Sequence, residues 1–274
     1  MRGFTGVWQR SVAALMTVPF VLVGCGQDSA PPVPTPGAVA GSTSPAPPPT
    51  LAITPKAGAK EAPISTEVGI ELTGGEVSDV TLVAADGERV KGRMRADGTS
   101  WVPDRPLRPG TRYRATVTAV GIDGKTTTAA TDFTTMAAPS QRTATGLYLV
   151  DGAEYGVAMP VVVEFMQPVP ESARAGVQRR MFVSTDPPQP GVWHWHPSGR
   201  AAYYRAPQYW QPGTKLHVRI ALDGHPTGEG RYGDQDRAAT VTIGSRLSIE
   251  VDNATKHMTV SGDGIETRRL PVSL

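Results

Sequence analysis

The chain has 274 residues, with 27 basic and 25 acidic side chains and a formal net charge of +2. Loss of Arg2 and Arg10 with an N-terminal leader would balance these charges, and a neutral body has no electrostatic attraction to a polyphosphate. Nucleic acid is therefore not an expected partner. The only cysteine is Cys25, which excludes an internal disulfide, so hydrophobic cores must stabilise a chain long enough for two domains.

The first 24 residues have the order of a secretory signal peptide. Basic residues come first, an apolar run from Val12 to Val23 follows, and Leu22-Val23-Gly24-Cys25 ends the segment. The apolar run is too short to span a bilayer. Because Cys25 lies between this leader and a proline-rich segment that can build no core, a buried core thiol is the weaker interpretation. We predict that 1–24 is removed and that lipid on Cys25 anchors the chain to the outer face of the cytoplasmic membrane.

Residues 25–50 combine the predicted lipidated cysteine with a segment dense in proline. Proline removes backbone donors and favours the extended polyproline II conformation. The segment is therefore predicted to be a stalk. A docking motif for a groove lined by aromatic residues is the alternative, but no such partner domain is expected outside the cell.

Short alternating segments follow from residue 51 to residue 245. Val68, Ile70 and Leu72 share one face of a predicted strand, and Val117, Ala119 and Ile122 are expected to share another around an irregularity at Gly121. The one helical candidate, 170–177, is short. Many short strands separated by turns predict an all-β fold made of β-sandwiches.

The pattern occurs twice, about 100 residues apart, which is the size of one immunoglobulin-like sandwich. Pro109-Gly110-Thr111 and Pro212-Gly213-Thr214 each precede an alternating strand, and 64–71 is similar to 157–164. The sequence therefore predicts two tandem immunoglobulin-like domains, at 51–138 and 139–245.

A dense aromatic cluster lies in the second predicted domain, where Trp193-His194-Trp195-His196 is followed by further rings. On a strand the tryptophans share one face and the histidines the other. Three interpretations are open: core packing by the tryptophans, a metal site at the histidines, or a platform for glycan. A structural metal site needs more ligands than two histidines, so no metal is predicted. The candidate glycan contacts are Trp193, Trp195, Tyr204 and Trp210.

The order of three segments resembles the lipid-anchored L,D-transpeptidases of high-GC Gram-positive bacteria: 210–214, 230–234 and 241–244. The resemblance implies two immunoglobulin-like domains before a catalytic β-domain with a cysteine nucleophile, which forms 3→3 cross-links in peptidoglycan. It also implies a position facing the cell wall, peptidoglycan as partner and no cofactor. Residues 246–274 are similar to the first strands of that catalytic domain.

The catalytic motif of the family, Ser-His-Gly-Cys, is absent from the chain, and His257 matches none of its catalytic positions. No catalytic residue is therefore assigned. No nucleophile elbow, zinc-binding helix motif or glycine-rich phosphate loop occurs either, and a glycosidase built on the acidic residues of the loops is disfavoured. Two hypotheses remain: an L,D-transpeptidase family member that is inactive by itself, and a non-enzymatic envelope lipoprotein whose domains bind peptidoglycan or an unknown protein partner.

Overall fold

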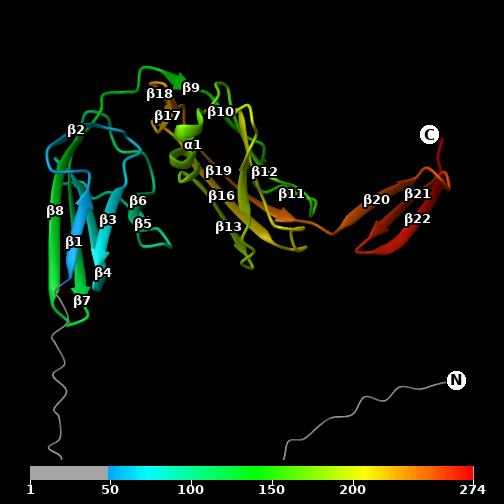
Figure 1. Cartoon of the computed structure of the whole chain (residues 1–274), viewed down its shortest axis with the longest axis horizontal. Helices are drawn as coiled ribbons and strands as arrows, with labels where there is room; N and C mark the ends of the chain where they lie inside the picture. Colours follow the sequence, from blue (N-terminus) through cyan, green and yellow to red (C-terminus); the bar gives the residue numbers. More distant parts are fainter. Residues whose placement is uncertain (1–48, 274) are drawn as a thin grey trace, which may run out of the picture. The chain divides into compact units, whose positions relative to one another are not determined.

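The structure is a computed structural model that describes residues 49–273. The predicted signal peptide, Cys25 and all but the end of the proline-rich segment lie outside the described residues. The described part is almost entirely β-structure, as the sequence predicts (Figure 1). Its one α-helix, α1 (Glu171–Gln178), has eight residues, and the described part of the chain contains no helix that is both long and apolar enough to cross a membrane.

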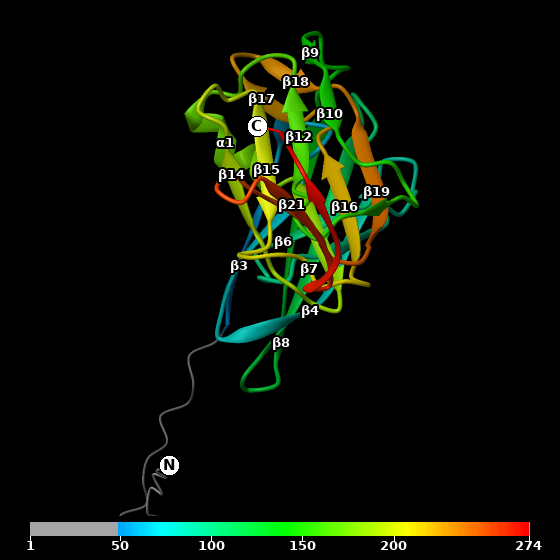
Figure 2. The same cartoon turned by 90° about the vertical axis from the view of Figure 1, so that its right-hand side faces the viewer.

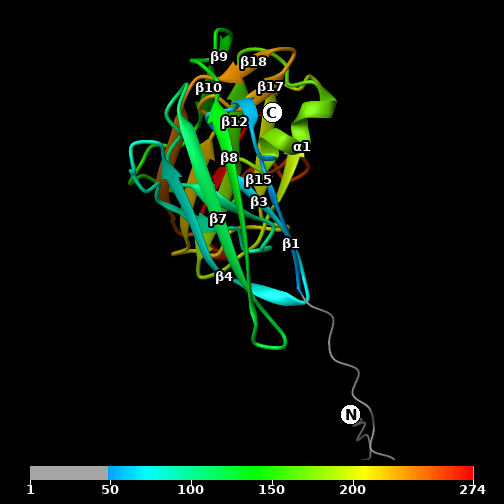
Figure 3. The ribbon, with the colours of Figure 1, turned by 90° about the vertical axis from the view of Figure 1, so that its left-hand side faces the viewer.

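Eight strands form the first sandwich, in two four-stranded sheets of order β1-β3-β6-β5 and β2-β8-β7-β4. Figure 3 shows the long strands β4, β7 and β8 running side by side, in agreement with their pairing. The strands are β1 (Thr50–Thr54), β2 (Ala59–Ala62), β3 (Val68–Thr73), β4 (Gly75–Ala84), β5 (Gly92–Met94), β6 (Ser100–Pro103), β7 (Arg112–Gly121) and β8 (Thr126–Thr135).

The second sandwich repeats this strand order. Its main sheets are β10-β12-β15-β14 and β11-β19-β16-β13, and a three-stranded sheet, β17-β18-β9, is added to them. The strands are β9 (Arg142–Thr143), β10 (Thr145–Leu147), β11 (Glu154–Tyr155), β12 (Val161–Phe165), β13 (Met181–Asp186), β14 (Val192–Trp195), β15 (Ala201–Arg205), β16 (Lys215–Ala221), β17 (Pro226–Gly228), β18 (Arg231–Gly233) and β19 (Asp236–Ile243).

The repeat is therefore one of topology as well as of sequence. β2 pairs with β8 in parallel, and β11 pairs with β19 in parallel at the corresponding place. The second domain differs by two insertions, because α1 lies between β12 and β13 and the β17-β18 hairpin lies between β16 and β19. The prediction of two tandem immunoglobulin-like sandwiches is confirmed, while the predicted residue limits of the domains stay predictions.

Each sandwich closes its own core between its two sheets. Tyr113, Phe133 and Leu82 are fully buried in the first core, and Leu216 and Ile220 are fully buried in the second. At about 25 cal/mol per Å² of buried apolar surface, such large side chains each contribute about 2 kcal/mol of transfer free energy. The two cores can therefore stabilise the chain without a disulfide.

The predicted strand faces are confirmed at Val68, Ile70, Val117 and Ala119, all of which are buried. The assignment of Ile122 to the same strand face as Val117 and Ala119 was wrong, since its side chain is 81% exposed. β7 ends at Gly121, and Ile122 belongs to the turn that follows it. The chain has already left the sheet at this point, so the period of two that governs a strand no longer applies.

A separate three-stranded antiparallel sheet follows, with the order β20-β21-β22. Its strands are β20 (Leu247–Asp252), β21 (His257–Gly262) and β22 (Ile265–Pro271). Leu247, Ile249 and Val251, which alternate as predicted, are 65%, 60% and 47% exposed. The three strands pair with one another through β21, but every residue of β20 and β22 is exposed, so the sheet has no buried core of its own.

Candidate functional site

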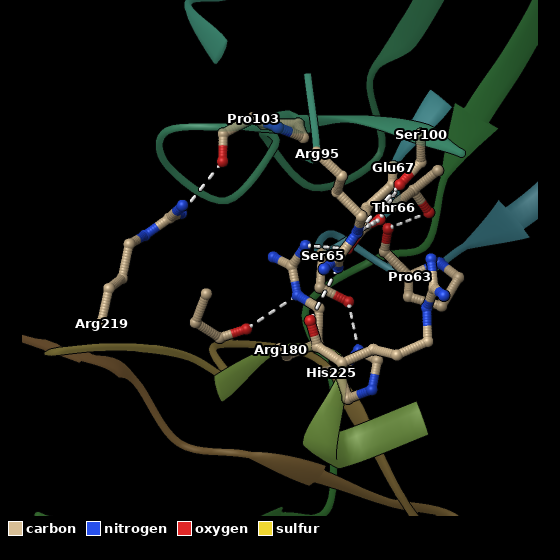
Figure 4. Close-up of polar contacts among 12 residues, drawn as sticks. Pro63, Ser65, Thr66, Glu67, Arg95, Ser100, Pro103, Arg180, Arg219 and His225 are labelled. Carbon is tan, nitrogen blue, oxygen red and sulfur yellow. Dashed lines mark hydrogen bonds and ion pairs between the residues drawn. The ribbon is translucent and has the colours of Figure 1, made fainter. Parts of the chain in front are cut away.

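A largely buried cluster of charged side chains joins the two sandwiches at Glu67 (Figure 4). The Glu67 carboxylate accepts hydrogen bonds from Arg95 of its own domain, with Nη2···Oε1 at 2.5 Å and Nε···Oε2 at 3.0 Å. It also accepts one from Ser100 Oγ at 2.6 Å. From the second sandwich, Arg180 Nη1 donates to Oε1 at 2.6 Å. One carboxylate therefore binds guanidinium groups from both domains.

The charged side chains of this cluster come from residues at the ends of strands and of the helix. Glu67 directly precedes β3, and Arg180 lies between the end of α1 and the start of β13. The side chain of Arg180 is only 4% exposed, and its Nε donates to the Ala221 carbonyl at 3.0 Å. Arg95 Nη2 also reaches the Arg179 carbonyl at 2.7 Å. The cluster is therefore satisfied by hydrogen bonds on both sides, as buried charges require.

Burial and hydrogen bonding act in opposite directions on the pKa of Glu67. Burial raises this pKa, but the hydrogen bonds from Arg95, Ser100 and Arg180 outweigh burial and lower it to about 2. Burial lowers the pKa of Arg180 from its ordinary value, and Glu67 opposes that change. Glu67 is therefore a carboxylate at neutral pH and is a poor candidate for a general acid or base.

A serine and a histidine also meet at this junction. Ser65 Oγ lies 3.1 Å from His225 Nδ1, and the backbone of Gly176 hydrogen-bonds the same histidine. Burial, followed by the charge of Arg180, lowers the pKa of His225 to about 4. Ser65 is only 5% exposed, and it lines, together with His225, a shallow pocket of about 300 Å³. The pair has the atoms of a nucleophile and a base, but its burial makes it a contact between domains.

A second contact surrounds the ring of Phe182 on β13. The guanidinium of Arg95 lies 4.9 Å from the ring centroid, and that of Arg219 lies 5.6 Å from it. Arg219 Nη2 donates to the carbonyls of Pro103 and Asp104, both at 2.9 Å. Planar guanidinium groups on an aromatic face add cation–π attraction to their hydrogen bonds. This contact connects β16 of the second sandwich to the end of β6.

The four predicted glycan contacts come together in the second sandwich, but they are not equally accessible. Trp193 and Trp195 share one face of β14 and pack partly buried against the core, while His194 is exposed. Tyr204 lies between Trp193, at 5.2 Å, and Trp210, at 6.2 Å between ring centroids. Trp210 is 2% exposed and donates its Nε1–H to the Met159 carbonyl at 2.7 Å. Trp210 therefore presents no free ring face, and the glycan role of the others stays a prediction.

The histidine pair of the same motif lies at the end of β14. His196 Nδ1 lies 2.7 Å from Ser198 Oγ, and both side chains are exposed. Within residues 49–273, no three His, Cys, Asp or Glu side chains are grouped so as to hold a metal ion. His257, the first residue of β21, has its Nδ1 2.6 Å from the carbonyl of Thr255 in the preceding turn.

Sequence reasoning missed the charged junction. Glu67 and Arg180 are 113 residues apart, and a single charged residue beside a strand is usually solvated. The only local signal is that each charge adjoins a buried apolar residue, Val68 in one case and Met181 in the other. Such a position suggests partial burial but does not identify the partner.

The repeated strand order and the two closed cores define the class of protein. Residues 59–226 match the family model for the bacterial Ig domain, and the chain belongs to this family. Among solved structures, tandem Ig repeats of Dlar match 72% of this chain and 98% of their own chain, with 11% identity and a TM-score of 0.38.

More particular relatives are L,D-transpeptidases. L,D-transpeptidase 5 of Mycobacterium tuberculosis (strain ATCC 25618 / H37Rv) is 36% identical over 205 residues, which are 74% of this chain and 44% of the relative. L,D-transpeptidase 2 of Mycobacterium tuberculosis (strain CDC 1551 / Oshkosh) is 29% identical over 217 residues, which are 79% and 52% of the two chains. The resemblance to the L,D-transpeptidase family is confirmed. The chain spans about half the length of these curated relatives.

A solved L,D-transpeptidase, LdtMt1 in complex with imipenem, is also similar in structure. It matches 48% of this chain and 53% of its own chain, with 28% identity and a TM-score of 0.37. Imipenem is bound to that protein.

Proposed function

We propose that this protein is a cell-envelope member of the L,D-transpeptidase family that is held on the outer face of the cytoplasmic membrane through lipid on Cys25. Its two sandwiches would act as spacers that hold residues 246–274 near peptidoglycan. The identity of 36% to L,D-transpeptidase 5 over three quarters of this chain carries the proposal. The Glu67 junction supports it, because buried contacts between the sandwiches oppose free rotation of one domain against the other.

We further propose that the 274-residue chain does not catalyse transpeptidation by itself. The chemistry of the family needs a thiolate, a base within hydrogen-bond reach and donors for the tetrahedral oxyanion. The chain contains one cysteine, which this proposal assigns to lipid. The Ser65 and His225 pair does not replace it, because burial lowers the pKa of His225 to about 4, which makes its imidazole a weak base.

Acylation by a carbapenem tests this inactivity. The full chain in detergent would be incubated with imipenem and measured by intact-mass spectrometry, beside an active L,D-transpeptidase as positive control. The expected result is an unchanged mass for this chain and a shifted mass for the control. A stoichiometric adduct on this chain would overturn the inactivity proposal and would identify the nucleophile by peptide mapping.

The alternative function is a non-enzymatic envelope lipoprotein whose immunoglobulin-like domains bind peptidoglycan. A groove in the second sandwich, about 480 Å³ in volume and lined by tryptophan and arginine side chains, favours this alternative. Co-sedimentation of the full chain with purified peptidoglycan sacculi tests it. Retention in the pellet is expected, and recovery of all the protein in the supernatant at low salt would contradict peptidoglycan binding.

A further inference from the structure

A four-residue segment of the first sandwich makes several of the contacts with the second. Residues 64–67 lie between β2 and β3. Ser65 Oγ lies 3.1 Å from His225 Nδ1, and Glu67 accepts a hydrogen bond from Arg180 at 2.6 Å (Figure 4). His225 directly precedes β17, which lies beside α1 (Figure 2). The segment therefore contacts the turn after β16 and the link between α1 and β13.

Ile64 is buried by this junction rather than by a core. Its side chain is 3% exposed, but it belongs to neither of the two hydrophobic cores. It lies against Gly224, where an added Cβ would overlap with the Ile64 side chain. Gly224 has a φ of +61°, in the left-handed region that favours glycine. Separation of the sandwiches would expose Ile64 at this contact and leave both cores closed.

The ring of His225 bridges the two sandwiches when it is neutral. A hydrogen bond with the Gly176 backbone favours the charged form of the ring, so the Gly176 carbonyl is the acceptor. These partners assign the proton of the neutral ring to Nε2, which leaves Nδ1 to accept from the Ser65 hydroxyl. A second proton on the ring would remove that acceptor and would add positive charge beside Arg180.

Charged groups of both signs surround His225. They are Glu67 from the first sandwich, Arg179 and Arg180 after α1, Asp223 on the same turn and Asp236 on β19. Asp223 is paired with Arg142 at 2.7 Å, and burial raises the pKa of Asp236. Glu67, with a pKa of about 2, stays ionised in mild acid. Within the contacts of residues 64–67, His225 is therefore the group that gains a proton first.

We propose that residues 64–67 are a latch that holds the two sandwiches in one orientation while His225 is neutral and releases them when His225 gains a proton. The proposal rests on the contacts of the junction and is independent of the proposed function. It makes the pair of sandwiches a rigid arm at neutral pH and a jointed arm in acid, with both cores intact in each state.

Proton binding gives the size of the effect. Opening returns His225 to water and to its ordinary pKa of 6.5, whereas burial and then the charge of Arg180 hold this pKa at about 4 in the closed junction. The open form therefore binds the proton more tightly, and it gains population as the pH falls from 6.5 to 4. Over this range the ratio of open to closed molecules should rise by up to roughly 300-fold.

Electron spin resonance distances between two labels test the latch. The full chain would carry labels at Lys125→Cys, in the turn between β7 and β8, and at Lys215→Cys, at the start of β16, with Cys25→Ser to remove the only other thiol. Both lysines are exposed. We expect a narrow distance distribution at pH 7.5 and a broad one at pH 4. The near-UV circular dichroism should stay unchanged, because both cores remain closed.

Three variants assign the effect to His225. His225→Asn keeps a donor and an acceptor without an ionisable group, so its distribution should stay narrow at pH 4. His225→Lys places a charge at the same position, so its distribution should be broad already at pH 7.5. His217→Lys, at an exposed position on β16, is the matched control and should be as narrow as the parent at pH 7.5.

The packing of Ile64 is tested without any titration. Gly224→Ala should broaden the distribution at pH 7.5 because the new methyl group overlaps with Ile64, and the double variant Gly224→Ala/Ile64→Ala should regain part of the narrow peak. A narrow distribution in Gly224→Ala would overturn the role of Ile64 in the latch.

Other outcomes overturn the latch as a whole. These are a distribution that is broad in the parent at pH 7.5, one that stays narrow in the parent at pH 4, and equal broadening at pH 4 in the parent and in His225→Asn. Broadening that coincides with loss of the near-UV signal would also overturn it, since the sandwiches would then unfold rather than separate.

Discussion

At the residue scale, Glu67 couples the two sandwiches through a buried ion pair. Glu67→Gln would leave Arg180 charged, 4% exposed and without its partner. Removing one member of a buried pair costs roughly 3–5 kcal/mol, and we expect this loss in the free energy of unfolding measured by chemical denaturation. The double variant Glu67→Met/Arg180→Met should lose less than the sum of the two single changes, because no unpaired buried charge remains from this pair.

An exposed pair provides the matched control. Arg93 and Asp104 form an ion pair at 3.1 Å with side chains 77% and 39% exposed. Asp104→Asn should cost less than about 1 kcal/mol, as is typical of surface pairs. A cost for Glu67→Gln as small as that of the control would show that the junction does not contribute to stability.

His225 should make stability depend on pH. Its folded-state pKa is about 4, below the ordinary value of 6.5, because of burial and the charge of Arg180. Between pH 6.5 and 4, the unfolded chain binds a proton at this residue that the folded chain does not, so stability falls as the pH falls. The loss reaches about 3 kcal/mol at most. Glu67, with a folded-state pKa of about 2 against 4.5, adds a further loss between pH 4.5 and 2.

Thermal melts at pH 4 to 7 measure the histidine contribution. His225→Asn should flatten the decline of Tm between pH 6.5 and 4, while His217→Asn, at an exposed position on β16, should leave it unchanged. An identical decline in the parent and in His225→Asn would rule out the assignment of this pH dependence to His225.

At the element scale, the sheet β20-β21-β22 should be the least stable part of the described chain. Its strands pair along their length, but Leu247, Ile249 and Ile265 are 60–72% exposed. Without buried apolar surface, the hydrogen bonds alone barely offset the loss of chain entropy. Hydrogen exchange should therefore be fast in 247–271 and slow in β7 and β16. Equal protection of the sheet and of these core strands would contradict the prediction.

Strands and turns are the features that the sequence alone predicts well. Alternation identified the buried faces of β3 and β7, and turn residues around Gly110 and Gly213, both of positive φ, marked the repeat. These signals are local, and the repeated topology follows from them. Ile122 was misassigned because its turn interrupts the period. Core packing and glycan contact both stayed open for Trp210, because aromatic content does not distinguish a core residue from a binding residue.

Contacts between domains lie beyond such local signals. Nothing near Glu67 identifies Arg180, 113 residues away, as its partner, and nothing near Arg174 shows that Trp195 lies under its guanidinium. The fold could therefore be predicted from periodicity, while the charged junction and the groove depend on how segments distant in sequence pack together. The lining of the groove combines α1, β13 and β14 with Arg95 of the first sandwich.

At the scale of the whole molecule, the proposal places the sandwiches outside the membrane on a lipid anchor. Cys25 follows Leu22-Val23-Gly24, and two or more acyl chains at about 0.8 kcal/mol per buried CH₂ hold a protein stably on a bilayer. The parent should partition into the detergent phase with the membrane fraction and incorporate radiolabelled fatty acid. Cys25→Ala should incorporate no label and should be either unprocessed or released from the membrane. Cys25→Ala with unchanged processing and labelling would show that lipid is attached elsewhere and would overturn the proposed anchor.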